Sequence, residues 1–386
     1  MDLGYFTTKF PYENHVNGYV CGGSVLATYY LVLEMAKNNN IKVFTTSADK
    51  NDSRELFNNL IIYRYATNLK IMTSNISSGL FYKPLSHNLD LIHVSFDMPP
   101  GPFASLRYVN KKNVPFVLTY HGDWEDSYGS IFRRSGVSFY NKFVNKILSK
   151  ADVIISPSES YIHSSKFLKK HQEKIKIIPN GIKIEEFELS YSKEYCRLKL
   201  DLPPDKDILL FFGYLSPYKS PDNLIRAFKN VIKKNPNTFL LFAGSGIMMD
   251  ELKRLSISLK IEDKVRFDGF VGKDLRPYYY KAADLFCLPS TLSTECHPLS
   301  ILESMASGTP VIASRIGGIP DIINDYVNGI LVEPGNVINL SNSILSVLND
   351  NLLKRRMEIN CKKIIKDYTW TNISEMTEQV YKDVIN

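Results

Sequence analysis

The sequence is poor in cysteine and contains no long hydrophobic run. Its 5 cysteines include no C-x-x-C pair and provide no disulfide framework, which indicates the reduced thiols of a cytosolic protein. No apolar stretch approaches the roughly 18 residues that span a bilayer. The first residues show no basic segment followed by an apolar core, so we predict no signal peptide. Together these absences predict a cytoplasmic protein.

Dense runs of one charge are also missing. Lys and Arg number 47 and Asp and Glu 40, which leaves a diffuse net charge of +7. Such an excess suits an anionic ligand or an anionic membrane surface. Without a dense run of Lys and Arg, we expect no nucleic acid as a partner.

Short apolar runs alternate with longer amphipathic stretches along the chain. Runs that are apolar throughout are typical of parallel strands covered on both faces, and their alternation with helices predicts doubly wound α/β domains. The runs of the first half lie at 3–6, 41–45, 60–65, 89–94, 116–120, 153–156 and 175–178, and those of the second half at 208–213, 239–243, 265–267, 285–288, 310–313 and 329–332.

The two series of runs predict two domains of similar size. Residues 188–207 contain two adjacent prolines, mixed charge and weak periodicity, which we interpret as a linker. We therefore predict Rossmann-like domains at 1–190 and 205–365. Doubly wound sheets bind ligands at the carboxyl ends of their strands, so two such edges facing each other would form a cleft.

The most informative segment is residues 294–312, which read TECHPLSILESMASGTPVI. A strand ends near Ser290, Pro298 suits the first turn of a helix, and Gly308 is placed to cap it before the next strand. The N-terminus of that helix would favour a phosphate through its free N–H groups and dipole. Glu295 precedes the helix and Glu303 lies about one turn inside it. Taken alone, the two glutamates could equally be a loop charge and a solvated helix face.

This segment closely resembles the E-x7-E motif of retaining GT-B glycosyltransferases of family 4, the group 1 glycosyltransferases. Their pattern is close to E-x-x-P-L-x-x-L-E-A-M-A-x-G-x-P-V-I-A, and this chain differs from it at Ser304, where Ala is usual. Residues 317–321 and 328–329 resemble the family's G-G-x-x-E and N-G patterns, with Asp321 for the usual Glu. The resemblance spans essentially the whole chain.

The resemblance implies a GT-B fold, in which two Rossmann-like domains face each other across a cleft. Residues 1–190 would bind the acceptor, residues 205–365 would bind the nucleotide sugar, and a helix in 366–386 would cross back to the first domain. Glu295 would contact sugar hydroxyls and Glu303 the ribose, and the donor would also contact the start of the helix, His297, Pro298, Leu299 and Ser300.

In the first domain, the resemblance implies two further contacts. Gly22 and Gly23 precede an apolar helix, where glycines let the backbone approach a diphosphate closely. His121 follows a strand and would face the donor sugar. A plain turn and a structural histidine are the alternatives.

In the second domain, residues 213–220 read GYLSPYKS, where the family usually has G-R-x-x-x-x-K-G. Gly213 and Lys219 match, and Lys219 would bind the diphosphate. Tyr214 occupies the place of an Arg that makes bidentate contacts, so one of the two usual cations is missing. Arg266 or Lys281 could supply that charge.

Other loops imply nucleotide contacts. Gly244 and Gly246 end a strand and lie near the nucleotide in the family. They do not form a G-x-G-x-x-G motif, because position 249 is Met, which argues against a nicotinamide cofactor. Phe270 and Val271 resemble the loop whose backbone contacts the base.

A basic amphipathic helix is predicted from Arg133, Arg134 and residues 139–150, with Phe139, Tyr140, Phe143, Ile147 and Leu148 on its apolar face. It could bind an anionic lipid surface on the inner face of the membrane, or it could be an ordinary domain helix with solvated lysines.

The expected activity is transfer of a sugar from a nucleoside diphosphate sugar to an acceptor hydroxyl, with retention at the anomeric carbon. The acceptor could be a glycan, a lipid-linked molecule or a small molecule. No D-x-D arrangement is placed for a metal, so we expect neither a metal nor another cofactor. His121, Lys219 and Glu295 are the predicted catalytic residues. The alternatives are a sugar-nucleotide epimerase of GT-B fold and a non-catalytic nucleotide-sugar-binding protein, for which Tyr214 is the main argument.

Overall fold

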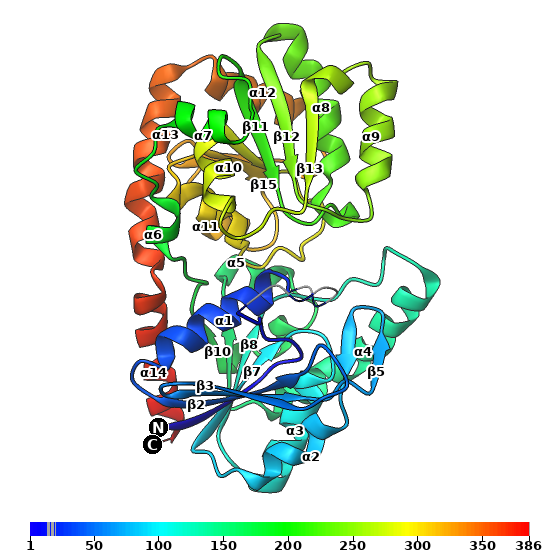
Figure 1. Ribbon diagram of the computed structural model, residues 1–386, viewed down its shortest axis with the longest axis vertical. Coiled ribbons are helices and arrows are strands. Elements are labelled where there is room, and N and C mark those ends of the chain that lie inside the picture. The colour runs from blue at the N-terminus through cyan, green and yellow to red at the C-terminus, as the bar shows by residue number, and fades with distance from the viewer. Residues whose placement is uncertain (14–15, 17–18, 20, 386) are drawn as a thin grey trace. The chain divides into compact units, whose positions relative to one another are not determined.

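The computed structural model describes residues 1–13, 16, 19 and 21–385. The chain forms two compact units (Figure 1). The first contains Met1–Gly181 and Trp370–Asn386, and the second contains Ile182–Thr369. Each unit is built around a mainly parallel sheet with helices on both faces, as the alternating sequence pattern predicts.

The first unit has an eight-stranded sheet in the order β10-β9-β8-β7-β1-β2-β4-β3, in which only β3 is antiparallel to its neighbour. A separate hairpin is formed by β5 and β6. The strands are β1 (Asp2–Phe6), β2 (Asn40–Thr46), β3 (Ser53–Phe57), β4 (Leu60–Tyr65), β5 (Leu69–Ile71), β6 (Ser74–Ile76), β7 (Leu91–Phe96), β8 (Phe116–Tyr120), β9 (Val153–Ser156) and β10 (Ile175–Ile177).

The helices of the first unit connect these strands, except the last, which comes from the C-terminus. They are α1 (Gly23–Met35), α2 (Gly79–Tyr82), α3 (Gly101–Lys112), α4 (Ile131–Lys150), α5 (Glu159–Ser164) and α14 (Trp370–Ile385), with short 3-10 turns η1 (Lys83–Ser86), η2 (Leu168–Lys170) and η3 (Gln172–Lys174). The C-terminal helix α14 packs against α1.

The second unit has a six-stranded parallel sheet in the order β13-β12-β11-β14-β15-β16. Its strands are β11 (Asp207–Phe212), β12 (Thr238–Ala243), β13 (Val265–Gly269), β14 (Leu285–Leu288), β15 (Val311–Ser314) and β16 (Gly329–Val332). Its helices are α6 (Ile184–Phe187), α7 (Lys193–Lys199), α8 (Pro221–Lys234), α9 (Met249–Ser258), α10 (Arg276–Ala282), α11 (Leu299–Ala306), α12 (Val337–Leu348) and α13 (Asn351–Ile364), with 3-10 turns η4 (Pro217–Lys219), η5 (Glu262–Lys264), η6 (Ile319–Asp321) and η7 (Ile365–Tyr368).

The prediction of a linker at 188–207 is wrong, because these residues belong to the folded second unit. The chain leaves the first unit at Gly181, and most of the stretch that looked irregular folds into the second unit. There, α7 buries Cys196, and Arg197 Nη2 donates to the Asp284 carboxylate at 2.6 Å. Weak periodicity in this stretch reflects a short helix that is fixed by a buried ion pair and not by a long apolar face.

Each sheet has one point where the order of its strands reverses direction. In the second unit, the chain moves from β11 to β12 and β13 on one side, and from β14 to β15 and β16 on the other. Connections in such sheets are right-handed, so the helices on the two sides cover opposite faces and leave a crevice at the carboxyl ends of β11 and β14. In the first unit the same reversal lies between β1 and β7.

Candidate functional site

Two of the predicted catalytic residues meet at the reversal point of the second sheet. Lys219 ends the turn η4 that follows β11, and Glu295 lies in the loop that follows β14. The Lys219 ammonium donates to Glu295 Oε1 at 2.5 Å. Both side chains are largely buried, with 12% and 8% of their surface exposed. The interpretation of Glu295 as a solvated loop charge is therefore wrong.

The environment of Lys219 keeps its ammonium charged. Burial alone lowers the pKa of Lys219, but the Glu295 carboxylate and the Tyr218 phenol outweigh burial, so the pKa is raised above its usual value. Burial also raises the pKa of Tyr218, whose ring lies 5.2 Å from Lys219 Nζ. The result is a fixed positive charge beside a carboxylate at the edge where doubly wound sheets bind ligands.

Two glycines contact the backbone carbonyl of Glu295 and fix the loop in which it lies. Gly318 N–H donates to the Glu295 carbonyl oxygen at 2.8 Å. Gly317 has φ of +58°, and a Cβ there would lie 2.3 Å from the same carbonyl oxygen. Ser290 Oγ, at the end of β14, donates to Glu295 Oε1 at 3.3 Å. The G-G pattern therefore positions the Glu295 loop.

Glu303 is buried on α11 and has partners on both carboxylate oxygens. Arg276 Nη1 donates to Oε1 at 2.6 Å, and the Tyr280 hydroxyl donates to Oε2 at 2.7 Å. Both partners lie on α10, one turn apart, so they share a helix face. Burial, together with the Glu303 carboxylate, raises the pKa of Tyr280 well above its usual value. Glu303 is therefore oriented by two donors and is not on a solvated helix face, as the second alternative supposed.

The helix α11 has the strand–loop–helix frame that the sequence predicts. Pro298 is the N-cap, Leu299 and Ser300 open the helix, and no side chain among the described residues caps its N-terminal N–H groups. At the other end Gly308 has φ of +74°, and its N–H donates to Met305 O at 2.9 Å. His297, just before the helix, is buried, and burial lowers its pKa to about 4, so its imidazole is neutral at physiological pH.

The loop after β11 contains the two residues, Tyr214 and Ser220, that depart from the family's G-R-x-x-x-x-K-G pattern. Tyr214 follows Gly213 and leaves 52% of its surface exposed. Ser220 has φ of +46°, a left-handed conformation that explains why Gly is usual at this position. Ser220 Oγ compensates by bonding to Thr291 Oγ1 at 2.6 Å and to Pro217 O at 3.1 Å. Replacement of Gly by Ser thus leaves the turn that carries Lys219 intact.

The glycines predicted near the nucleotide are required by backbone packing. A Cβ at Gly244 would lie 1.9 Å from Gly213 O, and a Cβ at Gly246 would lie 2.2 Å from Leu215 O. These glycines therefore allow the loops after β11 and β12 to lie against each other. In the next loop Phe270 is 68% exposed, whereas Val271 is buried. Contact of any of these four residues with a nucleotide stays a prediction.

The two cations suggested as substitutes for the missing Arg lie in different surroundings. The Arg266 guanidinium donates to Asp201 O at 2.7 Å, to Leu200 O at 2.9 Å and to Asp268 Oδ2 at 2.8 Å. Burial lowers the pKa of Lys281, and the charges acting on it come from side chains on α7 and α13. Arg266 is thus held by other partners, a role for Lys281 stays a prediction, and the structure brings Arg276 to Glu303.

The predicted residues of the first domain lie in the first unit. Gly22 is the N-cap of α1 and Gly23 its first residue, and a Cβ at either would meet no atom of the described chain within 4 Å. Packing thus gives no reason for these two glycines, unlike Gly244 and Gly246. A contact with a diphosphate stays a prediction.

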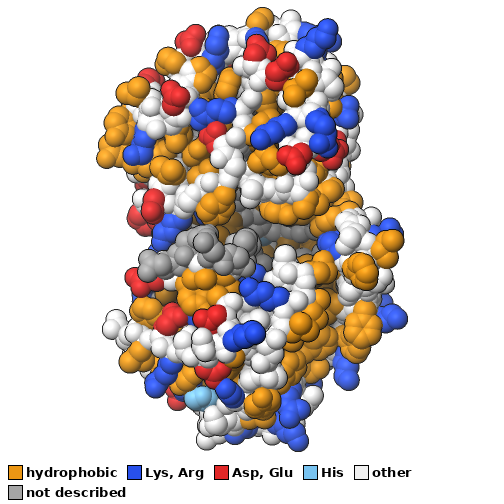
Figure 2. Space-filling model, turned by 45° about the vertical axis from the view of Figure 1, so that its right-hand side comes forward, with side chains coloured by type: hydrophobic (Ala, Val, Ile, Leu, Met, Phe, Trp, Pro, Cys, Tyr) orange, Lys and Arg blue, Asp and Glu red, His pale blue; other side chains and the backbone are white. Residues whose placement is uncertain are grey.

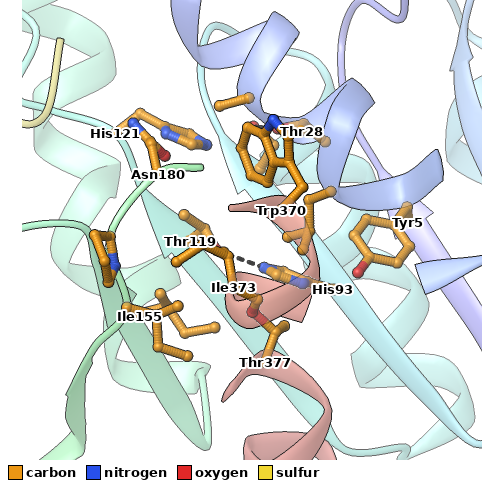
Figure 3. Close-up of a pocket in the computed structure, with 15 residues that line it drawn as sticks. Tyr5, Thr28, His93, Thr119, His121, Ile155, Asn180, Trp370, Ile373 and Thr377 are labelled. Carbon is orange, nitrogen blue, oxygen red and sulfur yellow. Dashed lines mark hydrogen bonds between the residues drawn. The ribbon is translucent and has the colours of Figure 1, made fainter. Parts of the chain in front are cut away.

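His121 lines a cavity beside β8 (Figure 3). The cavity, of about 20 Å³, is the size that holds a single water, and it also includes Thr119, His93, Trp370 and Thr28. Within the described residues, His121 Nε2 has no hydrogen-bond partner. Burial lowers the pKa of His121 to about 4, so the ring is neutral at physiological pH and can either donate or accept. This chemistry suits contact with a hydroxyl.

Comparisons with known proteins identify the family. The model of the group 1 glycosyl transferases matches residues 193–364, and that of glycosyltransferase family 4 matches residues 21–186. An uncharacterized glycosyltransferase of Methanocaldococcus jannaschii is 31% identical over 297 residues, which cover 76% of this chain and 75% of that protein. The chain belongs to the group 1 glycosyltransferases.

This group 1 glycosyltransferase is also similar to one further curated relative and to a solved structure. The α-monoglucosyldiacylglycerol synthase of Streptococcus pneumoniae is 32% identical over 254 residues, which cover 64% of this chain and 56% of that protein. This chain thus spans little more than half of that relative. HepE of Anabaena, solved in complex with UDP-glucose, has the same fold with a TM-score of 0.78 at 19% identity, covering 99% of this chain and 100% of that one.

Sequence reasoning missed two residues of the candidate site in this glycosyltransferase, Arg276 and Tyr280. Their four-residue spacing puts them on one helix face, which is a readable signal. That this face would meet Glu303 depends on how α10 packs against α11, and a single sequence does not show that packing.

The described part of the chain shows neither a cluster of metal ligands nor a membrane-spanning helix. Residues 1–13, 16, 19 and 21–385 contain no group of three or more His, Cys, Asp or Glu side chains placed to bind a metal ion. In the same part of the chain, no helix is long and apolar enough to cross a membrane.

Proposed function

We propose that this glycosyltransferase transfers a sugar from a nucleoside diphosphate sugar to an acceptor hydroxyl with retention of anomeric configuration. The observation that supports this most is the Lys219–Glu295 pair at the reversal point of the second sheet, beside the uncapped N-terminus of α11. There a cation and free N–H groups are available for a diphosphate, and a carboxylate is available for sugar hydroxyls. Residues 205–365 then bind the donor, and residues 1–190 bind the acceptor.

Each predicted residue has a role in this reaction. Lys219 and the N–H groups of Leu299 and Ser300 stabilise charge on the leaving diphosphate, and Glu303 accepts from the ribose. Glu295 accepts from the sugar hydroxyls, and His121 donates to one of them. The other donor contacts are Gly22, Gly23, Gly213, Tyr214, Gly244, Gly246, Phe270, Val271, His297 and Pro298.

The reaction exchanges one bond at the anomeric carbon. The bond from that carbon to the diphosphate oxygen breaks, the bond to the acceptor oxygen forms on the same face, and the acceptor proton passes to the leaving diphosphate. None of these steps requires a metal, because Lys219 and backbone N–H groups neutralise the diphosphate. We therefore expect transfer to persist after exhaustive treatment with EDTA. Loss of transfer that Mg²⁺ or Mn²⁺ restores would contradict this expectation.

The test of the function begins with a thermal-shift screen of the whole chain against UDP-glucose and other nucleotide sugars. UDP-glucose comes first because a protein of the same fold, HepE, has been solved with it. A ligand that binds the folded state raises its melting temperature. The stabilising donor is then incubated with candidate acceptors, and the anomeric configuration of the product is determined by NMR. Epimerisation of the donor without acceptor, or binding without turnover, would reject the proposal in favour of one of the two alternatives.

We also propose that α4 makes peripheral contact with an anionic membrane surface. Three large apolar side chains near its start are exposed, namely Ile131 at 78%, Phe132 at 87% and Phe139 at 62%. Arg134 and Lys142 line a surface hollow together with Ile131 and Phe139. Figure 2 shows hydrophobic side chains bordered by Lys and Arg on the first unit. Apolar side chains flanked by basic ones suit the interface of an anionic bilayer.

This arrangement corrects the predicted helix face. The helix begins at Ile131, two residues before Arg133, and its buried residues are Val137, Tyr140, Val144, Ile147 and Leu148, so Phe139 does not face the core. Flotation with vesicles of phosphatidylglycerol and phosphatidylcholine tests the contact. Phe132→Ser with Phe139→Ser should abolish binding, and Leu352→Ser, at an 85% exposed site on α13, is the matched control. Failure of the unsubstituted chain to float would disprove the contact.

A further inference from the structure

The loop after β11 lacks the Arg that its family pattern contains, and another arginine lies beside the end of the same strand. Arg276 opens α10, and its guanidinium lies 5.8 Å from the ring centroid of Phe212, the last residue of β11. Tyr214 follows only two positions later. Arg276 Nη1 also lies 2.6 Å from Glu303 Oε1 on α11. Arg276 therefore brings a positive charge to the start of the loop that an Arg at position 214 would occupy.

We infer that Arg276 is the second cation of the donor site and binds a phosphate of the nucleoside diphosphate. This inference rests on the proposed function and names a residue that neither the family pattern nor the comparisons assign. Arg276 thereby takes over the task of the residue that Tyr214 replaces.

The pairing of charges supports this assignment. Each glutamate of the E-x7-E motif binds one cation, Lys219 at Glu295 and Arg276 at Glu303. The two pairs are similarly accessible, since the Lys219 side chain is 12% exposed and that of Arg276 is 18% exposed. A guanidinium has five N–H groups in a fixed fork, so it can contact a carboxylate and a phosphate at once.

The residue at position 214 fits the same account. An Arg there would place two guanidinium groups beside the end of β11, and like charges that close repel each other. Tyrosine avoids this repulsion, and its ring can remain exposed at the surface of the loop. The exchange of Arg for Tyr at position 214 is therefore compensated by Arg276 and does not signal a lost activity.

The experiment compares ligands that differ only in their phosphates. Calorimetric titration of the whole chain with UDP and with uridine is carried out for the unsubstituted protein, Arg276→Gln and Arg276→Lys. We expect Arg276→Gln to weaken UDP binding by about tenfold or more, and uridine binding by less than about threefold. Arg276→Lys should lose less UDP affinity than Arg276→Gln. The loss of UDP affinity in Arg276→Gln should be smaller at high salt. Arg315→Gln, which removes an exposed arginine paired with Asp325, should change neither affinity.

The alternative is that Arg276 only orients Glu303. In that case Arg276→Gln weakens UDP and uridine by the same factor, as Glu303→Gln should, and the inference is overturned. Equal affinities for Arg276→Gln and the unsubstituted protein overturn it as well. If the unsubstituted chain binds none of UDP, GDP and ADP, the proposed function fails first. Nucleotide binding with unchanged Arg276→Gln leaves that function intact and removes only the inference.

A rescue variant tests the substitution directly. Tyr214→Arg should restore UDP affinity at least about threefold in the Arg276→Gln background, because it returns a cation to the same strand end. In the unsubstituted background, the same change should produce a smaller gain. An equal gain in both backgrounds would mean that the two positions act independently and would overturn the inference. Melting temperatures of all variants are measured alongside, and Arg276→Lys replaces Arg276→Gln if the latter is unfolded.

Discussion

Lys219 Nζ lies 2.5 Å from Glu295 Oε1, although the two residues are 76 positions apart in the chain. The contact joins the loops after β11 and β14, the two neighbouring strands at which the sheet reverses direction. Because both groups are largely buried, each depends on the other for its charge. The pair is therefore both a structural element of the second unit and the centre of the proposed donor site.

Glu295→Gln should separate these two roles. The amide keeps the shape and one acceptor oxygen but leaves the Lys219 ammonium without a counter-charge. We expect the free energy of unfolding to fall by about 3–5 kcal/mol, as measured by urea denaturation. Transfer should fall by about 100-fold or more, because the sugar hydroxyls lose a charged carboxylate and one of its two acceptor oxygens. Glu333→Gln, at an exposed position after β16, is the control and should change neither quantity. Full transfer activity in Glu295→Gln would remove Glu295 from the catalytic residues.

Gly317→Ala should disturb the Glu295 loop through a clash with its backbone. A Cβ at this position would lie 2.3 Å from the Glu295 carbonyl oxygen, and φ of +58° disfavours Ala in any case. We expect a loss of about 1–3 kcal/mol in unfolding free energy and a lower rate of transfer. Gly136→Ala on α4 is the matched control, because a Cβ there meets nothing within 4 Å and Ala favours the helix by about 1 kcal/mol. Equal stability of the two variants would show that the loop tolerates the change.

The sequence predicted a strand at every place where a central strand occurs in both sheets. These strands, such as β7 and β11, are buried on both faces and therefore consist of apolar runs. It missed β3, whose residues are mostly exposed at the sheet edge, and the short hairpin β5–β6. Edge strands and hairpins follow from hydrogen bonding to a neighbour and leave little trace in hydrophobicity.

Residues of the candidate site could be predicted where they lie together in one continuous segment of the sequence. Glu295, Glu303 and the cap at Gly308 all lie in the strand–loop–helix segment that the sequence displays directly. Arg276 and Tyr280 were not predictable, because they reach Glu303 only through the packing of α10 on α11. The inference about Arg276 would make Tyr214 the sign of a relocated cation and not of a lost one.

Asp97→Asn should alter how stability depends on pH. Burial raises the pKa of Asp97 to about 7, despite a hydrogen bond from Thr7 that lowers it. A carboxyl whose pKa is raised in the folded state stabilises the fold below its unfolded pKa, and this stability is lost as pH rises through about 7. Relative to Asp97→Asn, the unsubstituted protein should therefore lose on the order of 4 kcal/mol between about pH 4 and pH 8. Asp205→Asn, at an exposed site, should leave the pH profile of urea unfolding unchanged. A constant difference between the Asp97→Asn and unsubstituted profiles would show that Asp97 does not titrate in this range.

Tyr381→Phe should loosen the C-terminal helix α14 from the rest of the first unit. The Tyr381 hydroxyl is fully buried and lies 2.5 Å from both the Tyr5 hydroxyl and His93 Nδ1, while His93 Nε2 bonds to Thr119 Oγ1 at 2.6 Å. Burial, together with the nearby His121, lowers the pKa of His93 to about 3, so its neutral ring donates at one nitrogen and accepts at the other. Removal of the hydroxyl leaves buried polar atoms with fewer partners, which should cost about 1–3 kcal/mol of unfolding free energy.

The Tyr381 effect should be local and coupled to Tyr5. Hydrogen exchange should quicken in α14 and β1 of the variant and remain unchanged in β11 and β12. Tyr5→Phe combined with Tyr381→Phe should cost less than the sum of the single changes, because each removes the other's partner. Tyr326→Phe, at a 54% exposed site in the second unit, serves as the control. Additive losses, or protection of α14 that does not change, would mean that apolar packing of α14 against α1 fixes the helix without help from the Tyr5–Tyr381–His93 network.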